Sequence, residues 1–137
     1  MIHKIGGLAV GLVVALLTMM MLESAGNRLF NSGLPDDASA ESAIAIAQQP
    51  LGLLLFIVGG WLLGAFLGGA ATIYIARVRM LAWVVAAVLL IGAALRFWLM
   101  QHPNWMIVAG VAAPLIGVLL AMLVMRRRLA AHRKEAQ

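Results

Sequence analysis

The sequence predicts an all-α membrane protein, a single domain of four transmembrane helices in an antiparallel bundle with both termini inside. Hydrophobic residues make up 64% of the 137 residues and charged residues only 11%. Soluble domains carry about 45–50% apolar and about 25% charged residues, so this chain cannot cover a soluble surface with polar groups. Its apolar residues also gather into runs long enough to cross a hydrocarbon core of roughly 30 Å. The basic residues lie at alternate ends of these runs.

The predicted spans cover about residues 5–27, 51–76, 80–100 and 105–125. The first begins soon after Lys4, as a signal peptide does. Its apolar core is longer than the usual h-region of about 7–15 residues, however, and Glu23 fits poorly before a cleavage at Ala25. We therefore interpret the first run as a retained span.

The connection of residues 31–49 is predicted to be an outer loop. It opens with turn residues, and Asp36 or Asp37 can cap a short helix that lies at the bilayer surface. Pro50 then starts the second span, where its missing N–H costs nothing. Only a few residues around Arg77 separate the second and third spans, which predicts a tight hairpin.

Charge sets the expected orientation, because basic flanks stay in the cytoplasm. We expect a bacterial cytoplasmic (inner) membrane protein with cytoplasmic N- and C-termini and a basic tail that contacts anionic lipids. The net charge of +5 does not indicate nucleic-acid binding, since no aromatic–basic surface accompanies it. The residues concerned are Lys4, Arg77, Arg79 and the tail of residues 126–137 on the inner side, and Asp36, Asp37 and Glu41 on the outer side.

Small residues recur at every fourth position of the second span. This pattern lets two helix backbones approach closely, and similar strips run along the first and fourth spans. A nucleotide-binding loop would need a preceding strand and a following lysine, and neither is present. The partner of the face is left open: the same chain, a second copy in a homo-oligomer, or a partner membrane protein. The face consists of Gly60, Gly64, Gly68 and Thr72.

A charged pair is expected in the outer half of the bundle. Glu23 lies about 28 Å along the helix from Lys4, near the outer boundary, so a plain interfacial role for it stays open. Arg96 lies about 25 Å beyond Arg79, and apolar residues continue past it. Charges at membrane depth usually pair, and Glu23 is the acidic residue at comparable depth. We predict that Glu23 and Arg96 face each other, with Asn27 one turn above.

The connection "MQHPNWMIV" adds further candidates. His102 is a candidate proton acceptor or metal ligand, although a lone loop histidine more often does neither. Met100, His102 and Met106 raise a copper(I) alternative, which the scattered positions of the other methionines disfavour. Trp98 and Trp105 fit an aromatic belt at the interface. With no cysteine and no set of nucleophile, base and orienting residue, we predict no catalytic residue, metal or cofactor.

The stretches "ESAGNRLF", "QQPLGLLLF", "WLLGAFLGG" and "HPNW" together resemble an uncharacterised family of small four-span bacterial membrane proteins. The resemblance covers most of the chain through short motifs, and it implies the topology and a site at the outer face, but no activity. Asn27 stands where the family pattern has a histidine, so a shared proton or metal role does not carry over. The matching positions are Glu23, Gly26, Pro50, Gly64, Gly68, Gly69, His102, Pro103 and Trp105.

Three functional classes remain. The leading one is a non-enzymatic binding or accessory component with its polar site at Glu23, Asn27, Arg96 and His102. The second is a small transporter or channel in which Glu23 exchanges a proton or cation. The third is an intramembrane enzyme that acts on a lipid or quinone.

Overall fold

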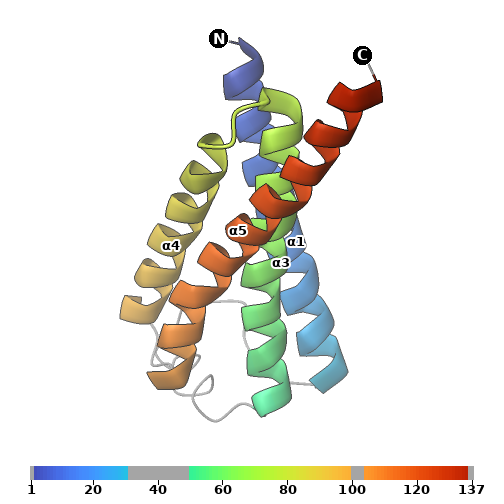
Figure 1. The fold of residues 1–137 in the computed structure, drawn as a ribbon. Helices are drawn as coiled ribbons and strands as arrows, with labels where there is room; N and C mark the ends of the chain where they lie inside the picture. Colours follow the sequence, from blue (N-terminus) through green and yellow to red (C-terminus); the bar gives the residue numbers. More distant parts are fainter. Residues whose placement is uncertain (1, 31–49, 100–103, 136–137) are drawn as a thin grey trace.

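The structure describes residues 2–30, 50–99 and 104–135, with residues 127–135 as backbone alone, and these residues are helical except for Pro50 and the turn at residues 77–80. In this computed structural model each helix is long and apolar enough to cross a membrane, so the all-helical, four-span prediction is confirmed for these residues. Figure 1 shows the helices side by side in one bundle. They are α1 (Ile2–Phe30), α3 (Leu51–Ala76), α4 (Leu81–Leu99) and α5 (Asn104–Glu135).

The predicted spans lie within the observed helices to within about three residues at each end: α1 extends three residues beyond its span on both sides, and the apolar part of the last helix covers Asn104–Arg126, as predicted. The helix α5 itself continues past this span to Glu135. The segment 126–135 contains Arg, Ala, Leu, Lys and Glu, which are strong helix formers, and neither Gly nor Pro. The apolar run therefore ends near Met125 while the helix does not. The predicted outer loop of residues 31–49, with its short surface helix, lies outside the described residues.

The hairpin between α3 and α4 is as tight as the sequence predicts. Arg77 ends α3 in the left-handed conformation with φ 55°, and its N–H donates to the carbonyl of Ile73 at 2.9 Å. This bond satisfies one of the carbonyls that a helix end leaves without a partner. At the other end of α3, the Pro50 carbonyl accepts from the Leu53 N–H at 2.9 Å, as expected for a proline directly before the first helical residue.

The glycine face of α3 packs against α1 of the same chain. A Cβ built at Gly68 would lie 2.5 Å from the Gly11 carbonyl oxygen and 2.7 Å from the Ala15 Cβ. A Cβ at Gly64 would lie 2.8 Å from the Met19 Cγ. Only glycine allows backbones this close, so α1 of the same chain occupies this face of α3.

Thr72 extends the same face but brings a polar group into it. Its side chain is fully buried and lies against Gly11. Among the described residues its hydroxyl oxygen has no hydrogen-bond partner.

The order of contacts gives the relative direction of α1 and α3. Near the start of α1, Gly7 packs on Ala76 at the end of α3; near the end of α1, Gly26 packs on Leu53 at the start of α3. The two helices therefore run in opposite directions. Figure 1 places the N-terminus, the α3–α4 turn and the C-terminus at the same end of the bundle.

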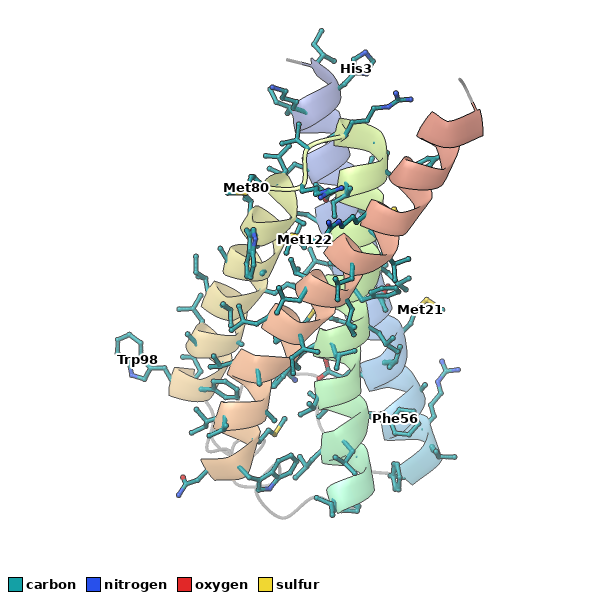
Figure 2. The ribbon with its side chains drawn as sticks, viewed as in Figure 1. His3, Met21, Phe56, Met80, Trp98 and Met122 are labelled. Carbon is teal, nitrogen blue, oxygen red and sulfur yellow. The ribbon has the colours of Figure 1, made fainter. Side chains whose placement is uncertain are left out.

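The opposite side of α3 packs against α5, where small residues of the two helices meet. A Cβ at Gly117 would lie 2.9 Å from the Ala65 Cβ, and one at Gly69 would lie 3.3 Å from the Ala121 Cβ. α3 is thus held between α1 and α5, whereas α1 meets α4 at few positions. Many large apolar side chains point outward, as lipid-facing residues do; Figure 2 shows Met21 and Trp98 directed away from the bundle.

Candidate functional site

Packing against α3 fixes the direction of the Glu23 side chain. One turn before Glu23, Met19 lies against Gly64. Three residues after Glu23, the buried Gly26 lies against Leu53, 2.9 Å from its Cδ1 if a Cβ is built. Residues three or four apart share one side of a helix, so Glu23 is held at the edge of the α1–α3 interface.

An aromatic contact fixes the direction of Arg96. The ring of Phe97 packs edge-on against the buried Trp61 of α3, with centroids 5.6 Å apart and planes at 81°. Phe97 also covers Gly110 of α5. Successive residues of a helix point about 100° apart. With Phe97 directed at α3 and α5, the neighbouring Arg96 turns toward α1.

These two anchors bring Glu23 and Arg96 together across the α1–α4 boundary. Arg96 Nη1 donates to Glu23 Oε2 at 3.1 Å, and Arg96 Nη2 donates to Glu23 Oε1. The fork geometry of two parallel charge-assisted bonds is the strong form of an arginine–carboxylate pair. The pairing predicted from the sequence is therefore present. The side chains stay 30% (Arg96) and 29% (Glu23) exposed, so the pair is accessible from outside the bundle.

The pair lies near the end of α4 that is opposite the α3–α4 turn. Arg96 precedes Leu99, the last residue of α4, by about 4.5 Å of helix rise. On α1, the helix continues past Glu23 to Phe30, a rise of about 10 Å. A helix that ends just beyond Arg96 places this charge close to one boundary of the apolar layer.

Other predicted members of the polar cluster are placed differently. Asn27 is partly buried one turn further along α1. His102 and Met100 lie outside the described residues. Met106 is fully buried in a core cluster that includes Leu53 and Trp61, a position that does not suit a ligand of an accessible copper ion. No group of at least three His, Asp or Glu side chains that suits a metal occurs in the described part of the chain.

The hydroxyl groups of Thr18 and Ser24 on α1 are not paired with Glu23 as a nucleophile with its base. Thr18 Oγ1 donates to the Val14 carbonyl of its own helix at 2.8 Å. Ser24 is exposed, about 100° around α1 from Glu23. The described residues place a carboxylate and a guanidinium side by side at this position, which suits recognition of charged groups.

Two aromatic residues that position the site were not anticipated. Phe97 directly follows Arg96, and Trp61 lies in the middle of a span rather than at an interface. That mid-span position was the available signal that Trp61 is a core residue, but its contact with Phe97 requires the tertiary structure. The predicted belt residues Trp98 and Trp105 are 87% and 39% exposed near helix ends, and their role as anchors stays a prediction.

No protein-family model, curated protein or solved structure matches this chain. Its function is therefore inferred from the four apolar helices and from the ion pair.

Proposed function

We propose that this protein is a non-enzymatic binding or accessory component of a membrane, with its ligand site at the Glu23–Arg96 pair. One observation carries the proposal: the pair is held by two bonds, yet both side chains remain about 30% exposed. An ion pair with a purely structural role in an apolar span contributes most to stability when protein surrounds it. Ionisable residues retained within membrane spans commonly mark functional sites, and this one is open to a ligand.

The proposed orientation places this site in the outer half of the bundle. Basic residues at Lys4, at the α3–α4 turn and from Arg126 onward lie toward one end, which we infer to be cytoplasmic; Arg28 and Arg96 are the exceptions. The four-helix antiparallel bundle would then lie in a bacterial inner membrane with both termini inside. The basic residues after α5 enters the cytoplasm would contact anionic lipids.

Partner proteins, if they bind, would use a surface other than the glycine face. That face is occupied by α1, and an oligomer built through it would have to displace the close backbone contacts at Gly64 and Gly68. The exposed apolar side chains of α4 and α5 are the alternative surfaces. Membrane lipids reach the same surfaces.

The experiment that tests the proposal compares the molecules that co-purify with three variants of the protein. Wild type, the neutral double variant E23Q/R96Q and the control R28Q are purified in mild detergent, and mass spectrometry identifies the bound lipids, small molecules and proteins. Arg28 is an exposed cation on the same helix, so R28Q controls for lost charge. We expect at least one species to be retained by wild type and R28Q and lost from E23Q/R96Q. Identical contents in all three would refute the proposal.

The transporter alternative has its own supporting observation, since the partial exposure of Glu23 lets a proton or cation reach the carboxylate. It predicts flux into liposomes that responds to pH and that falls in E23Q. Absence of flux for each tested ion favours the binding function. R28Q again serves as the control, because it removes a charge without touching the pair.

A further inference from the structure

We infer that the ligand of this site is a zwitterion, with an ammonium that binds Glu23 and a phosphate or carboxylate that binds Arg96. The inference deepens the proposed function and rests on it. It follows from the charge balance of the pair, from the donors and acceptors that it offers, and from its depth in the bundle.

Charge balance restricts the ligand first. Glu23 and Arg96 neutralise each other in the free protein through two hydrogen bonds. A simple anion that binds Arg96 leaves the Glu23 carboxylate without its counter-charge. A simple cation that binds Glu23 leaves the Arg96 guanidinium without its counter-charge. An uncompensated charge at low dielectric is strongly unfavourable. A ligand that carries both a positive and a negative group can bind beside the ion pair or separate its two side chains, and each charge still has a partner of opposite sign.

Hydrogen-bonding capacity points to the same chemistry. A carboxylate accepts about four hydrogen bonds and a guanidinium donates five, so the two mutual bonds use only part of their capacity. The planar fork of Arg96 matches phosphate or carboxylate oxygens, whereas a primary ammonium offers three donors to Glu23. The exposed fractions of about 30% are similar on the two side chains, so a single ligand can contact both.

The surroundings of the pair suit an amphiphile whose head group sits near the boundary of the apolar layer. On the membrane-centre side of Glu23, Leu16 and Met20 of α1 are 50% and 64% exposed. On the same side of Arg96, one turn back along α4, Gly92 is exposed, and a Cβ built there would meet nothing within 4 Å. An acyl chain can lie along this open apolar strip while its head group reaches the pair. A phospholipid with a primary ammonium, such as an ethanolamine lipid, combines these features.

Lipid titrations in detergent test the inference. Delipidated wild type is titrated with phosphatidylethanolamine, which is zwitterionic, and with phosphatidylglycerol, which is anionic; native mass spectrometry gives the apparent Kd of each. We expect tighter binding of the ethanolamine lipid. E23Q should weaken the binding of phosphatidylethanolamine about tenfold or more, because one charged hydrogen bond is lost, and should not weaken the binding of phosphatidylglycerol. R96Q should weaken the binding of both lipids, and R28Q should weaken the binding of neither.

A charge-reversed variant keeps the test valid if the neutral variants fold poorly. E23R/R96E retains an ion pair but reverses its direction, so its thermal stability should stay near that of wild type. The lipid phosphate lies between the ammonium and the acyl chains, so the head group cannot reverse freely. Binding of phosphatidylethanolamine should therefore fall in this variant. Unchanged binding would overturn the inference.

The outcomes separate the ligand class from the proposed function. Equal affinity for both lipids, with phosphatidylglycerol bound more tightly by E23Q, would overturn the zwitterion and leave a binding site for anions. Lipid binding that is the same in wild type, E23Q, R96Q and R28Q would overturn the inference, and unchanged co-purifying species in E23Q/R96Q would additionally remove the proposed function. Competition by soluble phosphoethanolamine as strong as that by the lipid would support the zwitterion and identify a soluble source.

Discussion

Replacing Gly68 with alanine tests the close packing of α3 on α1 that holds Glu23 in place. The new Cβ would lie 2.5 Å from the Gly11 carbonyl oxygen, 2.7 Å from the Ala15 Cβ and 3.2 Å from the Ala15 nitrogen. Two of these atoms belong to the backbone and cannot rotate away, so the helices must separate. Overpacking of this kind costs about 1–3 kcal/mol.

The matched control is Gly92→Ala, since Gly92 is a helical glycine with nothing within 4 Å of a built Cβ. Both substitutions gain the same helix propensity, up to about 1 kcal/mol. The difference between them isolates the steric term, and we expect G68A to be less stable than G92A by about 1–3 kcal/mol.

Reversible unfolding of detergent-solubilised protein, followed by circular dichroism, gives both free energies. G68V, with a larger side chain at the same position, should be less stable than G68A. Equal stabilities for G68A and G92A would show that the α1 and α3 backbones do not approach as closely as described, and the account of how Glu23 is positioned would fail.

Three further predictions follow. In a double-mutant cycle of E23Q and R96Q, we expect a coupling free energy of about 1–2 kcal/mol, since the pair has fork geometry but is partly exposed; additive effects would contradict the pairing. Thr72→Val should leave stability unchanged or raise it by up to about 1–2 kcal/mol because it removes a buried hydroxyl that has no hydrogen-bond partner among the described residues, whereas Thr72→Ser keeps that hydroxyl, deletes a buried methyl and should cost about 1 kcal/mol; the reverse order would show that the hydroxyl is satisfied. The chain has no cysteine, so a membrane-impermeant thiol reagent added to intact cells should label R28C but not R79C; the opposite pattern would invert the proposed orientation.

The spans could be predicted from the sequence because local signals mark their ends. α3 begins and ends at the predicted residues, since Pro50 precedes its first turn and a short basic turn follows it. α5 could not be bounded in this way. Hydropathy ends near residue 125, but helix propensity continues through the basic segment to Glu135.

The ion pair could be predicted because charges are scarce at that depth, leaving Arg96 a single acidic partner. The way in which the pair is held could not. The direction of Glu23 depends on the contacts of Met19 and Gly26 with α3, and that of Arg96 on the contact between Phe97 and Trp61. These are tertiary contacts between residues far apart in the chain, and no local pattern encodes them.

The most direct test of the central claim is a structure of the protein grown from a lipid mesophase that contains an ethanolamine phospholipid, compared with that of E23Q/R96Q. We predict a head group beside the pair in wild type, with its ammonium at Glu23 and its phosphate at Arg96, and no head group at that position in the double variant. Apolar side chains of the protein closed over an intact Glu23–Arg96 pair, with no ligand density beside it, would contradict the claim that this pair is a binding site.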